Sequence, residues 1–476
     1  MLASFRNDRR NIRLTLRIKK LKTVKNTLKN VVIYKGMQMS KFQLAVLIIF
    51  GLCIVGGIIA FSVYKGSGGT TTDLAIWGTI PAETWNSWYT NSPIYQNHLY
   101  RISYTYIPEA NFDQELVNAI AESRGPDVVL AMHDRLLKNQ SKLISIPVTS
   151  FALRDFQNTF IDGASVLVNS QGELAVPLVV DPLVLYFNKD IFANFTLVQP
   201  PVIWEQMYNL SQGMTLRDKG TGNILQSTIP LGAFNNVLHA KEILATLIMQ
   251  AGGSIVSNTV DFIRPSLSET FGLTYAPANA ALLFFTEFSN PAKVFYTWNR
   301  SLPDSLSEFA AGDSAMFIGF ASDYQRIKEK NPNLVFDVSF LPQSTGTKRA
   351  ITYGRMLSLA VTKGSTKTTP AFSAIFEMMT APSIQALANT LQLPPTRRDL
   401  LTNRPADSFQ SVFYDSAIQS VAWKDPDTDA TSKLFQDMVD SVASGRITTV
   451  EEAVNNAQKG LQSIINAVKP TGATTE

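Results

Sequence analysis

Residue types that perform covalent or metal chemistry are few in this sequence and poorly spaced for it. The single cysteine, Cys53, lies inside a long apolar segment. The three histidines, His98, His133 and His239, are far apart and lack metal-ligand spacing, so we interpret them as ordinary hydrogen-bonded residues. Neither a GxxxxGKS/T loop nor a GxGxxG after a strand nor a GxSxG elbow occurs. The sequence does not exclude a pair of carboxylates that cleaves glycosides. Because the other motifs are missing, the sequence predicts a non-enzyme without cofactor or metal.

One carboxylate, Asp181, stands between two apolar runs, 178–180 and 183–187. Pro182 follows it, and because proline has no N–H to donate, we expect it to interrupt an otherwise continuous strand. We interpret this segment as a strand that crosses between two lobes. Asp181 then either binds a ligand or is held by backbone amides at the crossing, and both interpretations stay open.

A second candidate site lies at the end of the first predicted strand, 74–77. Gly78 and Thr79 end this strand and lead into a helix that begins near Pro81, with Glu83 in its first turn. Free N–H groups at a helix start bind anions or hydroxyl groups. Thr79 and Glu83 are therefore candidate ligand contacts, although helix capping alone would also explain both.

The elements around these residues follow an α/β order. Strands predicted at 74–77, 102–107 and 128–130 alternate with helices at 81–89 and 113–123. Such alternation indicates a mostly parallel sheet. Further helices are expected at 204–211, 239–250, 278–288, 370–390 and 431–468, and further strands at 334–341 and 357–361.

Charge is unevenly distributed along the 476 residues. Of the 42 lysines and arginines, 12 lie in residues 1–41 beside one acid, Asp8, for a net charge of +11. The rest of the chain has 42 − 12 = 30 bases against 38 − 1 = 37 acids, a net charge of −7. The main domain is therefore mildly acidic, which argues against nucleic acid as a partner.

Residues 42–64 form a run of 23 residues without a charge. A helix of this length reaches about 34 Å, enough to cross the hydrocarbon core of a lipid bilayer. The basic residues before it predict a cytoplasmic N-terminal segment, 1–41, and place the chain beyond Lys65 on the extracytoplasmic face. Residues 65–72 are expected to form a flexible linker.

Two other interpretations of the apolar run are a cleaved signal peptide and a lipoprotein signal. The first would have a shorter apolar region and small residues at a cleavage site, for which 60–62 is a weak candidate. The second would place a small residue before Cys53, where leucine stands. We favour an uncleaved single-pass anchor. Residues 1–36 are either a basic arm on anionic lipid or lie upstream of a start at Met37 or Met39.

The segment VPLVVDPLVLYFNKDIF, followed by PPVIWEQM, resembles the sugar-type extracellular solute-binding proteins of ABC importers. The resemblance covers nearly all of residues 73–468 and implies an α/β, two-lobed periplasmic-binding-protein fold whose lobes close over a ligand by hinge motion. Other matching pieces are GPDVV (125–129), HDR (133–135), FAAGDSAMFIG (309–319), FLPQ (340–343) and PPTRRDL (394–400). The expected divisions are a first lobe at about 73–181 and 300–345, a second at about 182–299 and 354–468, and a flexible tail at 469–476.

The resemblance also implies which residues contact the ligand. Aligned on HDR, Asp134 and Arg135 fall where maltose-type members place polar ligand contacts, although a surface ion pair would also explain them. Ala131 stands where those members have a stacking Trp, which argues against maltodextrin itself. Strand crossings are expected near Asp181, Trp298 and Tyr353–Gly354. The expected ligand-binding set, each member of which packing or hinge structure could also explain, is Thr79, Glu83, Asp134, Arg135, Asp181, Asn235, Asn236, Trp298, Phe320, Tyr353 and Arg355.

The function implied is capture of a small solute, a sugar or oligosaccharide, outside the cell. ABC permease subunits and their ATPase, encoded by other chains, would then import it. Aromatic faces with a rim of carboxylate, arginine and amide groups suit a sugar. The alternatives are an anchored sensor or adhesin that uses the same clamp, and a surface glycosidase. Related clefts also take peptides, polyamines or metals, so the identity of the ligand stays open.

Overall fold

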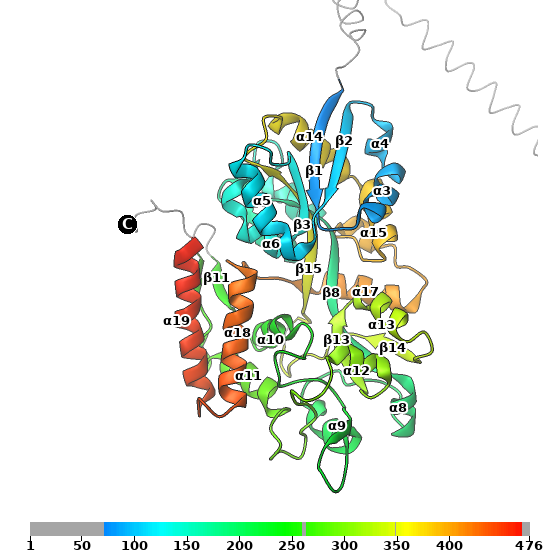
Figure 1. Cartoon of the computed structure of the whole chain (residues 1–476), viewed down its shortest axis with the longest axis vertical. Helices are drawn as coiled ribbons and strands as arrows, with labels where there is room; N and C mark the ends of the chain where they lie inside the picture. Colours follow the sequence, from blue (N-terminus) through cyan, green and yellow to red (C-terminus); the bar gives the residue numbers. More distant parts are fainter. Residues whose placement is uncertain (1–70, 259–262, 348, 469–476) are drawn as a thin grey trace, which may run out of the picture. The chain divides into compact units, whose positions relative to one another are not determined.

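The computed structural model describes residues 71–258, 263–347 and 349–468 (Figure 1). They belong to one unit that begins at Thr71. The predicted basic segment 1–41, membrane helix 42–64 and tail 469–476 lie outside the described residues. Within the described ranges, no helix is long and apolar enough to cross a bilayer.

Strand β8 (Val176–Asn188) is buried along its whole length. Its sequence is apolar apart from Asp181 and the final asparagine, which is typical of a strand covered on both faces. The predicted interruption at Pro182 is wrong, because the strand continues through it. The chain tolerates the missing N–H there because the strand partners change at this residue: Pro182 lies opposite Gly354, and its carbonyl accepts the backbone N–H of Ala321 at 2.9 Å.

The partners of β8 differ between its two halves. Its first half pairs antiparallel with β15 (Thr352–Thr362). Its second half pairs antiparallel with β13 (Met316–Phe320) on one side and with β14 (Phe336–Ser339) on the other. One strand therefore runs through the sheets of two lobes, and the crossing predicted at Asp181 lies where the partners change (Figure 1).

The sheet of the first lobe is mixed. Strand β1 (Thr72–Gly78) pairs in parallel with β2 (Tyr100–Tyr106) and β3 (Val128–Met132), as the alternating pattern predicted. Strand β15 then joins β3 in the antiparallel direction, so the expectation of a mostly parallel sheet is only partly met. The other elements of this lobe are α3 (Ala82–Asn91), α4 (Pro93–Gln96), α5 (Phe112–Ala121), α6 (His133–Lys138), β4 (Leu143–Ile144), β5 (Ile146–Pro147), α7 (Leu153–Thr159), β6 (Val168–Asn169), β7 (Gly172–Glu173), α14 (Thr368–Met378), α15 (Ala381–Leu391) and α16 (Arg398–Leu401).

The second lobe surrounds the other half of β8 with helices. Its elements are α8 (Lys189–Asn194), α9 (Gln206–Met214), β9 (Leu216–Arg217), β10 (Ile224–Gln226), α10 (Ala240–Gln250), β11 (Val256–Asn258), β12 (Ile263–Pro265), α11 (Pro277–Glu287), α12 (Ser305–Ala311), α13 (Asp323–Lys330), α18 (Thr428–Ala443) and α19 (Val450–Val468). Between the lobes lie α17 (Ser408–Ile418) and β16 (Ser420–Val421), and β16 pairs in parallel with the start of β15. Residues 419–427 thus form a further link, because α17 packs in one core and α18 in the other.

Two apolar cores separate along β8. The first contains Trp85 and Trp88 and extends over one face of β13 and β14, and the second contains Trp298. Trp298 is therefore a core residue of the second lobe and does not mark a crossing. The prediction placed residues 300–345 with the first lobe. Leu306 and Phe309 of α12 and Ile327 of α13 do pack in the first core, whereas β13 and β14 pair with the second half of β8.

Gly354 lies on β15 at the crossing, in close contact with β16. A Cβ at this position would lie 2.5 Å from Ser420 Oγ and 2.9 Å from Val180 Cγ2. We expect Gly354→Ala to lower the free energy of unfolding by about 1–3 kcal/mol, the usual effect of overpacking. Gly213→Ala, in helix α9, is the matched control, since its Cβ would meet nothing within 4 Å. It should be neutral or stabilising by up to about 1 kcal/mol. Denaturant unfolding tests both, and equal stability of the two variants would contradict the close packing.

Candidate ligand-binding site

Asp181 lies at the crossing with both carboxylate oxygens bonded to protein donors. Ser322 donates its backbone N–H to Oδ1 at 2.9 Å and its hydroxyl to Oδ2 at 2.7 Å. Arg355, the cross-strand partner of Asp181, donates from Nη2 to Oδ2 at 3.3 Å. Burial raises the pKa of Asp181, and Arg355 and Ser322 offset only part of that rise. These contacts match a carboxylate that fixes the position of Arg355.

Arg355 directs its guanidinium toward the aromatic side of this junction. The guanidinium carbon lies 4.1 Å from the centre of the Phe320 ring, within the range of a cation–π contact. Burial would lower the pKa of Arg355, but Asp181 and other carboxylates raise it above its usual range. Its Nε is buried and has no hydrogen-bond partner within the described ranges. Arg355 is therefore a charged donor whose buried Nε–H is unused.

Tyr353 connects the aromatic residues on the two sides of the junction. The centre of its ring lies 6.4 Å from that of Phe320 and 6.2 Å from that of His133. The side chain is almost fully buried. Burial raises the pKa of the Tyr353 hydroxyl well above its usual value, so the hydroxyl is neutral and is able both to donate and to accept a hydrogen bond.

His133, at the start of α6, has a defined tautomer. Its Nδ1 accepts the backbone N–H of Met356 at 3.2 Å, so the neutral ring carries its proton on Nε2. Burial lowers the pKa of His133 to about 4 against the opposing charge of Asp134, and the ring is therefore neutral near pH 7. Nε2 is buried and finds no partner in the part of the chain that the structure describes. His133 thus offers a second unused N–H donor.

The first turn of α10 brings charged side chains from the second lobe. His239 adopts a left-handed backbone conformation, with φ at 63°, and its Nε2 lies 2.7 Å from Asp323 Oδ2. Lys241 is nearly buried, and its Nζ donates to Asp425 at 2.9 Å and to the hydroxyl of Thr428 at 2.7 Å. The protein itself therefore supplies partners for the side chains of His239 and Lys241.

Glu242 lies in the same turn, and its side chain is half-buried. A negative charge in the first turn of a helix is favoured by the helix dipole. Alongside the larger effect of burial, the charge of Glu242 acts to raise the pKa of His133, Tyr353 and Arg355. One carboxylate, two N–H donors and a neutral hydroxyl can together accept hydrogen bonds from, and donate them to, a polar ligand.

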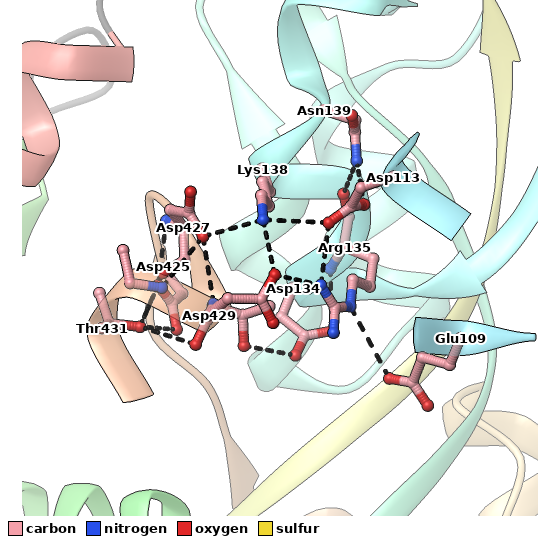
Figure 2. Close-up of polar contacts among 12 residues, drawn as sticks. Glu109, Asp113, Asp134, Arg135, Lys138, Asn139, Asp425, Asp427, Asp429 and Thr431 are labelled. Atoms are coloured by element: carbon pink, nitrogen blue, oxygen red, sulfur yellow. Dashed lines mark hydrogen bonds and ion pairs between the residues drawn. The ribbon is translucent and has the colours of Figure 1, made fainter. Parts of the chain in front are cut away.

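Asp134 and Arg135 lie at the boundary with α18 (Figure 2). Asp134 accepts the backbone N–H of Arg135 at 2.9 Å and the hydroxyl of Thr428 at 3.1 Å. Arg135 contacts Asp113 of its own lobe at 2.9 Å and Asp429 of α18 at 2.7 Å. These two predicted ligand contacts are therefore engaged largely by the protein, across the boundary between the lobes.

Thr79 and Glu83 occupy the start of the connection from β1 to α3. Thr79 is half-buried, and its backbone N–H donates to the carbonyl of Leu130 at 3.0 Å. Because β1 and β3 are parallel neighbours, this residue lies at the same sheet edge as His133. The Glu83 side chain is exposed on α3.

Asn235, Asn236 and Trp298 lie within the second lobe. The indole N–H of Trp298, which is fully buried, donates to Asn236 Oδ1 at 3.0 Å. Asn236 in turn donates to the carbonyls of Asn299 and Leu302 and so ties a loop together. Asn235 is exposed and accepts from Gln436 at 2.6 Å. Of the predicted set, the structure brings Asp181, Phe320, Tyr353 and Arg355 together at the crossing, and Asp134 binds Thr428 at the boundary with α18.

Sequence reasoning missed four residues around the crossing: His133, His239, Lys241 and Glu242. The prediction of ordinary hydrogen-bonded histidines fits His239. His133 differs, because only one of its two ring nitrogens has a hydrogen-bond partner in the described residues. The HDR motif contained the signal for His133. The other three follow shortly after Asn235–Asn236 and begin a predicted helix, where the helix dipole favours the carboxylate of Glu242 but gives no signal for His239 or Lys241.

Comparisons with known proteins bear on this arrangement. A family model described as bacterial extracellular solute-binding protein matches residues 95–412. No curated protein sequence shows a significant match. Among similar solved structures, a cyclo/maltodextrin-binding protein complexed with maltotetraose is 15% identical, with a TM-score of 0.68 over 85% of this chain and 100% of that chain.

Two further structures have the same fold. The cyclic alpha-maltosyl-1,6-maltose binding protein from Arthrobacter globiformis is 13% identical, with a TM-score of 0.69 over 84% of this chain and 100% of that chain. An ABC transporter solute binding protein from Thermotoga lettingae TMO, bound with alpha-D-tagatose, is 19% identical, with a TM-score of 0.60 over 83% and 100%. At these identities the likeness establishes the two-lobed fold.

His133 makes the stability of the folded chain depend on pH. Because burial lowers its pKa from 6.5 to about 4, the unfolded chain binds a proton between these pH values that the folded chain does not. The contribution of His133 to the free energy of unfolding is therefore fully present above about pH 6.5, and it falls by about 3 kcal/mol as the pH approaches 4. His133→Asn, whose Oδ1 can accept the Met356 N–H, should remove this part of the slope. Urea unfolding from about pH 4 to 7 compares the two proteins, and parallel curves would contradict a buried neutral imidazole.

Proposed function

Because the chain belongs to the family of bacterial extracellular solute-binding proteins, we propose that residues 73–468 capture a carbohydrate between two lobes and deliver it to ABC permease subunits with a separate ATPase. One observation supports this most directly: His133 Nε2 and Arg355 Nε are buried without a hydrogen-bond partner in the described residues, beside the rings of Tyr353 and Phe320 at the strand crossing. Structures of similar fold were solved with maltotetraose and alpha-D-tagatose, which supports a carbohydrate ligand.

The unused groups at the crossing suit a neutral polyol. A sugar hydroxyl both donates and accepts hydrogen bonds, so its site must supply both kinds of group. His133 Nε2 and Arg355 Nε supply donors, and Glu242 supplies an acceptor. The C–H face of a sugar packs well against aromatic rings such as Phe320 and Tyr353. A ligand carrying only negative charge would face the carboxylate of Glu242, which makes a neutral sugar the better fit.

Ligand access requires the lobes to separate, since Phe320, Tyr353 and His133 are almost fully buried. Bending at β8, at β15 and at residues 419–427 would open the space between the lobes, and closure would surround the ligand. In this proposal Asp134, Arg135 and Asp181 line or support the site. Thr79 and Glu83 lie at its outer edge, and the group formed by Asn235, Asn236 and Trp298 shapes the second lobe behind it.

We further propose that residues 42–64 anchor the protein in the membrane, with residues 1–41 in the cytoplasm and the binding lobes outside. The proposal is supported by the 23 uncharged residues that follow 12 basic ones. An anchored receptor stays near its permease, and tethering raises the effective concentration of one partner at the other. The protein then acts in capture and transport and performs no catalysis.

Sugar binding should appear as stabilisation of the purified full chain. A sugar present at about 100 times its Kd raises the free energy of unfolding by about 2.7 kcal/mol, and the melting temperature rises accordingly. Glu242→Gln removes the charged acceptor and should weaken binding about tenfold or more. Glu451→Gln, on the exposed side of α19, makes the same chemical change away from the crossing and should leave the affinity unchanged.

The panel for this measurement contains mono- and oligosaccharides together with peptides, polyamines and metal ions. A shift with peptides, polyamines or metals alone would overturn the carbohydrate assignment. Cleavage of an oligosaccharide during incubation would overturn the non-catalytic role. Equal affinities of Glu242→Gln and Glu451→Gln would show that the site lies elsewhere.

The anchor is tested on the protein in its own membrane. We expect the full chain to resist extraction at alkaline pH and its binding lobes to be accessible to protease added from outside the cell. Mass spectrometry of the purified protein should find residues 42–64 intact. A mature N-terminus near residues 60–62 would instead establish a cleaved signal peptide, and lipid attached to Cys53 would establish a lipoprotein.

A further inference from the structure

Two helices from different lobes meet at a cluster of opposite charges (Figure 2). Helix α6 belongs to the first lobe, because Leu136 and Leu137 are buried in its core. Helix α18 belongs to the second lobe, because Phe435 and Met438 are buried in the other core. An interaction between these helices therefore connects the two bodies that must separate when the cleft opens.

The cluster consists of two cations of α6 and three carboxylates, two of them from the start of α18. Lys138 Nζ lies 2.6 Å from Asp429, 3.0 Å from Asp427 and 3.1 Å from Asp113. Arg135 Nη1 lies 2.7 Å from Asp429 and 2.9 Å from Asp113. Arg135 and Lys138 are three residues apart, so they lie on one face of α6. Asp113 holds both cations from the side of their own lobe.

This cluster differs from an isolated surface ion pair. Arg135, Lys138, Asp113 and Asp427 are each at most 24% exposed at the side chain, and Asp429 is 58% exposed. Burial would raise the pKa of Asp429, but Arg135 and Lys138 lower it below its usual value, so the carboxylate is charged near neutral pH. Shared charges in a half-buried network interact more strongly than single exposed pairs.

We propose that the residues Asp113, Arg135, Lys138, Asp427 and Asp429 form an ionic latch that keeps the two lobes together in the absence of ligand. Charge-assisted hydrogen bonds between 2.6 and 3.0 Å across the lobes tolerate little displacement, so any rotation that moves α6 away from α18 breaks them. The free energy of opening then depends on ionic strength. When the lobes separate, the charges of the latch are exposed to solvent, where salt screens their attraction. If the proposed capture of sugar is correct, the same latch sets how much of the protein is open to receive it.

The latch is tested by measuring the distance between the lobes without any ligand. Ser87→Cys on α3 and Gln212→Cys on α9, both exposed, supply spin-label sites in the full chain, with Cys53→Ser to remove the native thiol. Pulsed electron paramagnetic resonance then gives the distance distribution at about 0.01 M and about 1 M salt, where the Debye length is about 30 Å and about 3 Å. We expect a longer-distance population to increase at high salt.

The variant Asp427→Asn with Asp429→Asn removes the second-lobe charges of the latch. Asn at 427 keeps an oxygen for the N-terminal cap that Asp427 provides to α18. The ratio of short to long distances at low salt should fall about tenfold, and its dependence on salt should largely disappear. Lys138→Gln changes the latch from the first lobe and should act in the same direction.

Asp437→Asn is the matched control, because it removes one charge from the same helix at a residue that pairs with Lys433 within α18. It should behave as the unmodified protein. Identical distance distributions in the double variant, in Lys138→Gln and in Asp437→Asn at both salt concentrations would overturn the latch. The measurement uses no sugar, so that result would leave the capture proposal untouched, and a failure to bind sugars would leave the latch untouched.

Discussion

The antiparallel pairing of β8 with β15 constrains the rest of the molecule. Each strand contributes to both apolar cores, and their cross-strand partners Asp181 and Arg355 meet where the chain passes from one lobe to the other. Because Arg355 is held by Asp181 and lies over Phe320, the orientation of the polar site follows from the register of this pair. Helix α6 then places His133 beside Tyr353 of β15.

Several charges are buried around this pairing at a cost in stability. An apolar side chain in place of a buried ion pair is often neutral or stabilising, because two charges lose their hydration when they are buried. The crossing nevertheless contains Asp181 with Arg355 and, nearby, Lys241 with Asp425. A buried ion pair fixes the orientation of both of its side chains. This helps a site that must present one N–H group in a fixed direction. The buried charges therefore fit a role in orientation better than a role in stability.

Local sequence patterns predicted the elements better than their pairing. The apolar run of β8 and the alternation through β1, β2 and β3 were visible in the sequence, whereas the antiparallel direction of β15 depends on contacts more than 170 residues away. The site follows the same rule. Residue type alone made Trp298 a candidate, but its indole N–H is satisfied inside the second core. The tautomer of His133 depends on the backbone of Met356, 223 residues along the chain, which no local pattern records.

The continuity of β8 through Pro182 also affects how the two lobes lose their structure. Neither sheet is complete without this strand, so melting one lobe removes a buried strand from the other. We therefore expect the lobes to unfold in a single cooperative transition, although each has its own core. Calorimetric and van't Hoff enthalpies should then agree for the pair as a whole. A protein built this way does not come apart at the joint between its halves.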